Sequence, residues 1–111
     1  PYSNGNEAAQ RNIEAWLDDV KTACNLDSEL ALEISGCAGL IKGYGDTIER
    51  GSVNFERIRE SIVVPALSGS IDVKRATDAL VNARAAALSD PDGKRLTELL
   101  SEFDRDNLTA D

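Results

Sequence analysis

The chain has 111 residues, of which 20 are Asp or Glu and 12 are Lys or Arg, so its formal net charge is −8. This length is sufficient for one domain with a modest core, and we treat residues 1–111 as a single domain. A strongly negative charge disfavours polyanionic partners, so we expect binding neither to nucleic acid nor to an anionic membrane.

The composition also bears on where the protein resides. The sequence has no apolar run long enough to cross a membrane, and its first ten residues lack the charged start and apolar centre of a signal peptide. Cys24 and Cys37 fall on apolar helical stripes, so we expect free, buried thiols, with a disulfide as the minority alternative. These features favour a reducing, cytoplasmic location. Because the chain has no methionine, even at position 1, we expect it to be a piece of a longer polypeptide.

Two amphipathic helices are predicted in the first part of the chain. The first spans residues 7–24, where apolar residues recur every three or four positions. Asp27 is then placed to cap a second helix, whose apolar stripe advances by steps of four and three, as in a helical bundle. The expected buried side chains are Ala9, Ile13, Trp16, Leu17, Val20 and Cys24 in the first helix and Leu30, Ile34, Cys37, Ile41 and Tyr44 in the second.

The apolar stripe resumes after a Gly-Tyr-Gly junction, in a third predicted helix. Gly51 occupies a position that should face the core, so we expect another helix to pack closely against it. Pro65 lacks an N–H and disfavours helical geometry at Val64, so this helix is expected to end near Val63 or to kink there. The other residues on its apolar side are Ile48, Phe55, Ile58 and Ile62.

Two further helices are predicted after a loop at residues 68–72. Asp72 can cap the fourth helix, and Asp90 followed by Pro91 is typical of the start of a fifth. Small residues on the fourth helix suit close packing against a neighbour. The two apolar stripes are Val73, Ala76, Leu80, Ala83 and Ala87, and then Leu96, Leu99, Leu100 and Phe103. Since no segment alternates as a strand does, the predicted fold is all-α, an antiparallel bundle of four or five helices.

The sequence offers few groups for catalysis. It has no histidine, and its two cysteines are too few for a zinc site or an iron–sulfur cluster. The adjacent acids Asp18 and Asp19, and the pair Asp104 and Asp106, are interpreted as solvated helix faces, because neighbouring residues diverge around a helix. We therefore assign no catalytic, cofactor-binding or metal-binding residue.

The Gly-Tyr-Gly junction admits two interpretations. Glycines before a helix expose N–H groups that bind phosphate or carboxylate, and Lys42 would add positive charge. The spacing is not that of a P-loop, however, and a helix precedes the glycines where nucleotide-binding loops follow a strand. The favoured interpretation is that Gly43 ends one helix in a left-handed conformation while Asp46 or Thr47 caps the next.

Residues 41–60 differ electrostatically from the rest of the chain. They carry four basic and four acidic groups, whereas residues 1–40 carry a net −5 and residues 61–111 a net −3. Even mixing of charge is typical of ordinary pairing along a helix face, and it also suits a contact surface. Tyr44 continues the apolar stripe and is expected to pack into the bundle, with a partner-facing ring as the alternative.

Residues 31–58, ALEISGCAGLIKGYGDTIERGSVNFERI, resemble a segment of the indolepyruvate ferredoxin oxidoreductase family, the thiamine-diphosphate-dependent 2-oxoacid oxidoreductases. The resemblance is confined to this segment and is strongest in KGYGDT. Ile48 stands where the family has a histidine, which removes a titratable group and favours a packing role for the motif. The matching residues are Lys42, Gly43, Tyr44, Gly45, Asp46, Thr47, Arg50, Gly51, Asn54 and Phe55.

The resemblance implies a parent enzyme that oxidatively decarboxylates arylpyruvates such as indolepyruvate. Its cofactors would be thiamine diphosphate, Mg²⁺, iron–sulfur clusters and coenzyme A, with ferredoxin as electron acceptor. The chain would then be a helical accessory domain within one polypeptide of an indolepyruvate oxidoreductase, not catalytic alone, that contacts other domains or subunits of the enzyme. We expect none of these cofactors to bind this chain by itself.

Packing or subunit docking is the role expected of the family motif within such an enzyme. The residues expected to take part are Lys42, Gly43, Tyr44, Gly45, Asp46, Thr47, Arg50 and Gly51. One alternative is a freestanding acidic interaction module that docks through residues 41–60. Another is a small-molecule binder that uses the Gly-Tyr-Gly loop.

Overall fold

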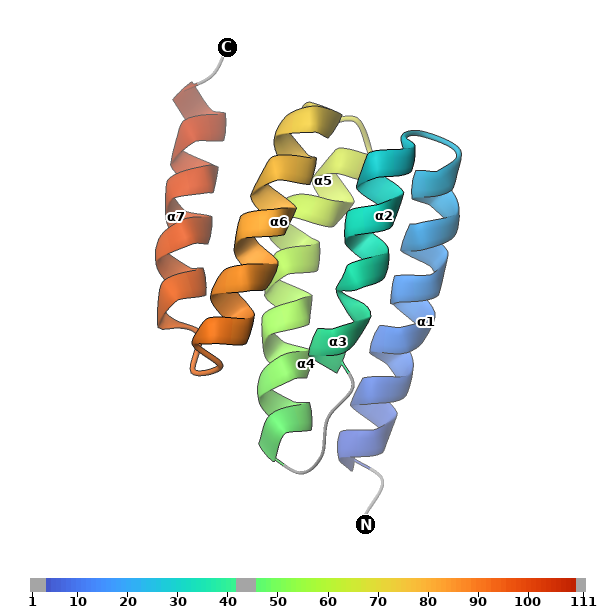
Figure 1. The fold of residues 1–111 in the computed structure, drawn as a ribbon, viewed down its shortest axis with the longest axis vertical. Coiled ribbons are helices and arrows are strands. Elements are labelled where there is room, and N and C mark those ends of the chain that lie inside the picture. Colours follow the sequence, from blue (N-terminus) through green and yellow to red (C-terminus); the bar gives the residue numbers. More distant parts are fainter. Residues whose placement is uncertain (1–3, 42–45, 110–111) are drawn as a thin grey trace.

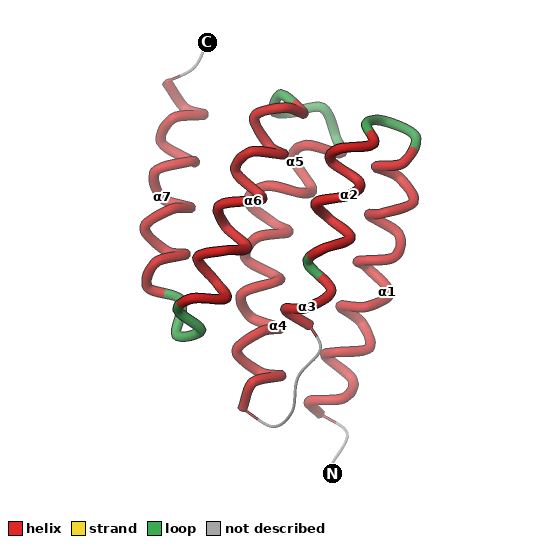
Figure 2. Tube along the Cα trace, in the orientation of Figure 1, coloured by secondary structure: helices red, strands yellow, loops and turns green. Residues whose placement is uncertain are grey.

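The computed structural model describes residues 4–41 and 46–109, with side chains described for 10–41 and 50–107. The described residues form five helical rods and no strand, so the predicted all-α bundle is confirmed (Figures 1 and 2). The rods comprise α1 (Asn4–Cys24), α2 and α3 (Ser28–Gly36 and Ala38–Ile41), α4, η1 and α5 (Asp46–Ile58, Arg59–Val63 and Val64–Leu67), α6 (Val73–Ser89) and α7 (Lys94–Thr109).

Successive rods run in opposite directions, as short connections require. Figure 1 shows α2 and α6 in front of α4, with α1 at one edge of the bundle and α7 at the other. The molecule measures 47 × 30 × 19 Å, a thickness that two packed helices fill. Within this arrangement α7 packs on the bundle chiefly through α6.

In the residues whose side chains are described, the core confirms the apolar stripes of four of the predicted helices; Tyr44 and Ile48 are not among those residues. Leu30, Ile34, Ile58, Ile62 and Leu80 are almost completely excluded from solvent. Burying one such aliphatic side chain contributes about 1.5–3 kcal/mol. Other predicted positions that lie in the core are Cys37, Ile41, Phe55, Ala76, Ala83, Ala87, Leu96, Leu100 and Phe103.

The buried face of α1 differs from the predicted one. Ile13 and Leu17 are exposed, Leu17 by 44%, whereas Asn12, Asp19 and Ala23 are buried. The helix is therefore rotated about its axis relative to the face that its apolar pattern predicted. The reason is that Asn12 and Asp19 have polar partners across the interface, which compensate the loss of water.

Two predicted helix caps are confirmed. The Asp27 carboxylate accepts the N–H groups of Glu29 and Leu30 at 2.9 and 3.0 Å, so α2 begins where this side chain replaces the missing backbone acceptors. Asp72 accepts the N–H of Arg75 at 3.1 Å at the start of α6. The predicted loop at 68–72 is confirmed as the connection between α5 and α6.

For the helix that contains Pro65, the sequence left two alternatives, an end near Val63 or a kink there. The first is wrong, because the rod does not end near Val63. It continues to Leu67 through η1, a π-helical turn that closes with a hydrogen bond from the Val64 N–H to the Arg59 carbonyl. A proline ring collides with the carbonyl four residues earlier in a regular α-helix, and a wider turn relieves that collision. The irregularity therefore falls at the predicted place, while the end of the helix lies later.

The start of α7 is also later than predicted. Asp90 is the residue that follows α6, Pro91 and Asp92 form a turn, and α7 begins at Lys94. Gly93 has φ +90°, a left-handed conformation that glycine adopts without strain. The Asp90 carboxylate still supports α7, since it accepts the Arg95 N–H at 3.2 Å. Pro91 therefore lies in the turn before α7 and not at the first position of the helix, where it was predicted.

Candidate docking surface

Some residues of the family motif precede the start of α4 in the sequence, and the others belong to α4. Lys42, Gly43, Tyr44 and Gly45 lie outside the described residues, so their predicted roles stay predictions. Asp46 and Thr47 are the first two residues of α4, and their side chains are likewise not described. The remaining motif residues can be placed, because Arg50 and everything after it on α4 is described.

Gly51 lies at a close crossing between α4 and α3, as its place on the apolar stripe predicted. A Cβ atom at this position would stand 1.8 Å from the carbonyl oxygen of Leu40. That contact is with backbone, which cannot swing aside as a flexible side chain does. The glycine therefore allows the two rods on either side of the junction to approach each other.

The polar residues of α4 hold the loop between α6 and α7 and the first turn of α7. The Asn54 amide donates to the Pro91 carbonyl at 3.1 Å. Arg57 donates to the Thr97 hydroxyl at 2.7 Å and to the Gly93 carbonyl at 3.5 Å. Asn54, which belongs to the family pattern, thus has a structural role that joins segments far apart in the chain.

Arg50 has only a weak attachment to the same loop. Its guanidinium is 3.6 Å from the Asp92 carboxylate, and the two side chains are 55% and 70% exposed. Exposed ion pairs of this kind contribute at most about 1 kcal/mol. Of the motif side chains that are described, Arg50 is therefore the one available to a partner.

A shallow cleft adjoins Arg50 on this face of α4. Its volume is about 300 Å³, and it is lined by Arg50, Val53, Asn54, Arg57, Pro91 and Asp92. Two of these side chains are cationic and one is anionic, so the cleft carries a net +1 on a chain whose net charge is −8. Val53 adds an apolar surface that is 55% exposed. We call this surface the α4 face, defined by Arg50, Val53 and Arg57.

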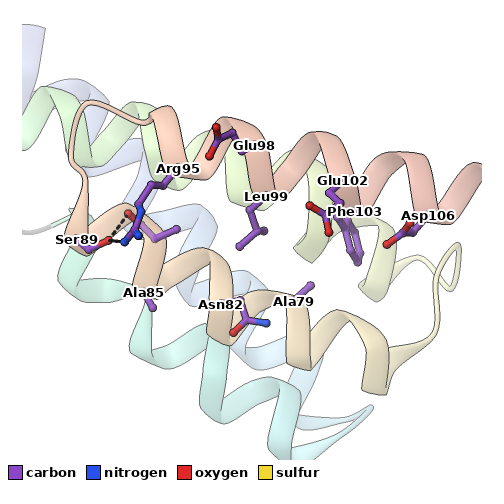
Figure 3. A pocket seen from close by; sticks show the side chains of 11 residues that line it. Ala79, Asn82, Ala85, Ser89, Arg95, Glu98, Leu99, Glu102, Phe103 and Asp106 are labelled. Atoms are coloured by element: carbon purple, nitrogen blue, oxygen red, sulfur yellow. Dashed lines mark hydrogen bonds between the residues drawn. The ribbon is translucent and has the colours of Figure 1, made fainter.

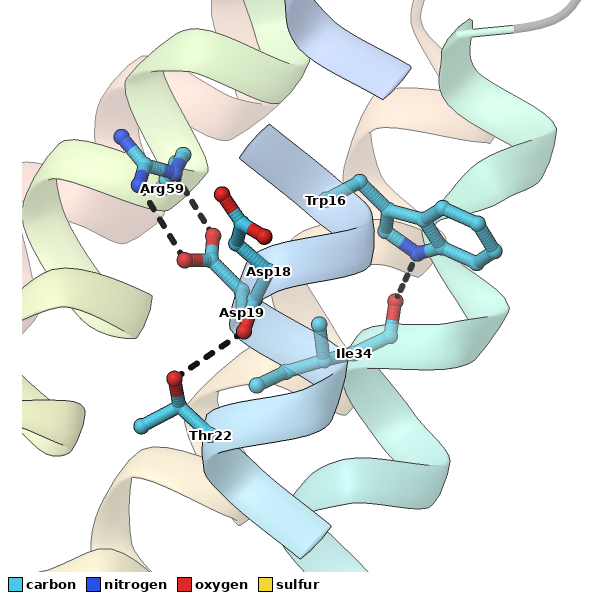
Figure 4. Close-up of polar contacts among 6 residues, drawn as sticks. All are labelled: Trp16, Asp18, Asp19, Thr22, Ile34 and Arg59. Carbon is cyan, nitrogen blue, oxygen red and sulfur yellow. Dashed lines mark hydrogen bonds and ion pairs between the residues drawn. The ribbon is translucent and has the colours of Figure 1, made fainter. Parts of the chain in front are cut away.

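A second polar centre holds α1 against η1 (Figure 4). The Arg59 guanidinium donates to both oxygens of Asp19, at 2.6 and 3.1 Å, and this hydrogen bonding raises the pKa of Arg59. Asp19 was interpreted as a solvated acid, and that interpretation is wrong because its side chain is only 7% exposed. Asp18 beside it is exposed, as predicted. The sequence carried no signal of this pair, since Arg59 is 40 residues away.

Trp16 marks the break between α2 and α3. Its indole N–H donates to the Ile34 carbonyl at 2.7 Å (Figure 4). The same oxygen accepts the Cys37 N–H at 3.0 Å. A side chain that competes for a carbonyl of the helical ladder is a common cause of such irregularities. The bond also ties α1 to α2, so the role of Trp16 is to stabilise the fold and not to form a binding site.

The two cysteines are free, and only one is buried. Cys37 lies in the core, where burial raises the pKa of its thiol to about 11, an effect that Arg84 opposes and Glu33 reinforces. Cys24 is exposed, which corrects the prediction that both would be buried. The cause is the rotation of α1, which turns its predicted apolar face partly toward solvent.

A larger groove runs between α6 and α7 (Figure 3). Its volume is about 690 Å³. Three alanines, Asn82 and Ser89 of α6 face longer side chains of α7, among them Leu99 and Phe103. The sequence prediction assigned no role to this groove, because the small residues of α6 were expected to be covered by a neighbouring helix. Helix α7 covers part of that surface and leaves the groove beside it.

Comparisons with known proteins identify no relative. No family model, no curated protein and no solved structure matches this chain. Within residues 4–41 and 46–109, no helix combines the length and apolar character needed to cross a membrane. In the same part of the chain, no group of three or more His, Cys, Asp or Glu side chains is arranged to hold a metal ion.

Proposed function

We propose that this chain is a helical docking domain that binds another protein domain or subunit through its α4 face. In line with the resemblance of residues 31–58, the proposed partner is the rest of an indolepyruvate-type 2-oxoacid ferredoxin oxidoreductase. The thiamine diphosphate, Mg²⁺, iron–sulfur clusters and coenzyme A of such an enzyme would reside outside this chain. The domain would support assembly and leave the chemistry to its partners.

The observation that supports docking is the contrast between the α4 face and its surroundings. An accessible arginine, an exposed valine and a cleft with net positive charge occur together on a chain with net charge −8. Arginine beside apolar surface is a common combination at the energetically important points of protein interfaces. A partner surface with carboxylates would be attracted to this face and repelled by most of the others.

The test removes the cationic motif side chains from the full-length polypeptide that contains this chain. Arg50→Ala combined with Lys42→Ala should reduce assembly with the partner subunit, measured by co-purification and size-exclusion chromatography. The thermal midpoint of the isolated domain should change little, because the ion pair of Arg50 with Asp92 is exposed.

A matched control separates docking from a general loss of charge. Lys21→Ala combined with Lys74→Ala removes two exposed cations from α1 and α6, away from the α4 face. This variant should assemble as the unmodified protein does. Normal assembly of the Lys42→Ala, Arg50→Ala protein would overturn the proposal and leave the motif with a purely structural role.

A second candidate is a freestanding interaction module, and the groove between α6 and α7 favours it. That groove offers a second binding surface remote from the family motif. The size of the endogenous protein distinguishes the two candidates. An immunoblot that detects a protein of about this length would support the module, and a chain several times longer would support the accessory domain.

A further inference from the structure

The groove between α6 and α7 has the dimensions of a helix-binding site. On α7 it extends from Arg95 to Asp106, which corresponds to about 16 Å or three helical turns. Its volume of about 690 Å³ is sufficient for several large side chains. The side chains that line the groove all come from α6 and α7, and α7 lies at the edge of the bundle (Figure 1).

The α6 side of the groove consists of three alanines together with the polar residues Asn82 and Ser89. Ala79 and Ala86 of α6 and Leu99 of α7 are only partly buried. The ring of Phe103 projects from α7 toward α6 at the Ala79 end of the groove (Figure 3). Small residues on one helix let a second helix approach closely, and ridges of larger side chains then fill the space. A partner helix would therefore place its apolar side chains over Ala79, Ala86 and Leu99.

Both ends of the groove are held in place by interactions between the two helices. At one end the Arg95 guanidinium donates to the Ser89 hydroxyl at 3.3 Å. At the other end the Arg75 guanidinium lies over the Phe103 ring, 5.8 Å from its centre. Leu96, Leu100 and Phe103 of α7 are also buried in the core, so α7 is held beside α6 before any partner arrives, which lowers the entropic cost of binding.

The rim of the groove on α7 has an acidic excess, since Glu98, Glu102 and Asp106 outnumber Arg95. Glu98 and Glu102 are four residues apart, so their carboxylates project from adjacent turns on the same side of α7. Both side chains are exposed, and neither forms an ion pair or hydrogen bond within the described residues. Charge complementarity therefore favours a cationic occupant.

We propose that this groove binds an amphipathic helix of a partner protein, with leucine-like residues on one face and Lys or Arg residues four positions apart beside them. The apolar face covers Leu99 and the alanines of α6, and the basic residues pair with Glu98 and Glu102. A second copy of this chain is a poor occupant, because two molecules with net charge −8 repel each other. This surface is distinct from the α4 face and does not depend on the function proposed for it.

The test uses a fluorescein-labelled model peptide of about 18 residues, long enough to be helical, with leucine on one face and lysine elsewhere. A second peptide has glutamate in place of every lysine. Fluorescence anisotropy should show saturable binding of the Leu/Lys peptide and none of the Leu/Glu peptide. Amide chemical-shift changes on titration should be concentrated in α6 and α7.

Variants locate the binding surface. Glu98→Gln with Glu102→Gln should raise the Kd of the Leu/Lys peptide about tenfold at low salt, the effect of losing two exposed ion pairs. The control Glu14→Gln with Asp18→Asn removes two exposed acids, also four residues apart, from α1. It should change the Kd less than about twofold. Ala86→Leu, which fills the base of the groove, should also weaken binding.

Three outcomes would overturn the proposal. Equal weakening by the α1 control would mean that the peptide binds the overall negative charge. Unchanged affinity of the Glu98→Gln, Glu102→Gln protein, which retains every apolar contact, would show that the two glutamates do not contribute to peptide binding. A dimer in light scattering that Ala86→Leu converts to a monomer would show that a second copy of the chain occupies the groove.

Discussion

At the scale of single residues, the glycines of this chain differ in what a side chain would meet. A Cβ at Gly51 would collide with a backbone carbonyl of α3, whereas at Gly36 it would collide with the guanidinium of Arg84, the flexible end of a side chain. At Gly39 nothing lies within 4 Å. Glycine is therefore required by the packing at position 51, whereas position 39 has room for a side chain.

Substitution of these glycines by alanine should separate packing from helix propensity. Gly39→Ala should stabilise the protein by about 0.5–1 kcal/mol, since alanine is the better helix former and meets open space. Gly51→Ala gains the same propensity but collides with the Leu40 carbonyl, so we expect a net loss of about 1–2 kcal/mol. Urea denaturation measures both changes. A Gly51→Ala protein as stable as Gly39→Ala would contradict the close crossing.

The buried thiol of Cys37 should make stability fall at alkaline pH. Burial raises its pKa from the ordinary 9.0 to about 11, so the native state holds the thiol proton more tightly than the unfolded chain does. The resulting stabilisation is fully present below about pH 9 and is lost as the pH rises through about 11. A shift of two pKa units corresponds to about 2–3 kcal/mol.

Urea denaturation at a series of pH values between these limits checks this prediction. The Cys37→Ala variant should show a shallower decline of stability than the unmodified protein, while Cys24→Ala, at an exposed position, should show the same decline. A thiol reagent should modify Cys24 in the folded protein and Cys37 only after unfolding, because the thiolate is the reactive form. Equal declines in both variants would exclude Cys37 as the cause.

At the scale of elements, polar pairs determine how α1 docks on the bundle. Asn12 donates to Glu56 of α4 at 3.4 Å, and Asp19 pairs with Arg59 of η1. The π-helical turn of η1 lies directly before Pro65, so the residue that receives Asp19 stands at the one irregular turn of its rod. Arg59 therefore belongs both to the irregular π-helical turn and to the ion pair with Asp19.

Asp19→Asn should loosen the contact between α1 and η1. The amide keeps the size of the carboxylate but leaves Arg59 without its anionic partner, at a cost of about 1–3 kcal/mol, below the range for a fully buried pair since Arg59 is 33% exposed. The neighbouring Asp18→Asn is the control and should change stability by less than about 0.5 kcal/mol. Similar effects of the two substitutions in thermal denaturation would show that the pair contributes little.

At the scale of the whole molecule, the five rods form a core and two unequal edges. Helices α2, α4 and α6 surround the apolar centre. Helix α1 closes one edge through Ala23, Trp16 and Val20 as well as its polar pairs, and α7 closes the other chiefly through α6. Because α7 has a neighbour on one side only, a groove remains beside it. The two surfaces proposed for partners lie on different elements, α4 on the one hand and the α6–α7 pair on the other.

Much of this architecture is encoded locally. Helical periodicity placed the stripes through Leu30, Ile58 and Leu80 in the core, and the capping chemistry of Asp27 and Asp72 gave the starts of α2 and α6. Such features depend on residues within one or two turns, which is why the sequence alone determined the all-α class and most of the core. Gly51 was also predicted correctly, because a glycine on an apolar stripe leaves room that a neighbour can fill.

Only the tertiary structure decided the features that depend on partners distant in the chain. The rotation of α1 follows from the pairing of Asp19 with a residue 40 positions away, and no local pattern distinguishes that acid from Asp18 beside it. The groove beside α7 follows from which side of α6 is left uncovered, a matter of packing geometry and not of periodicity. The sequence therefore determined which helices form and which faces are apolar, while the three-dimensional arrangement decided which polar groups became buried and which surfaces stayed open to a partner.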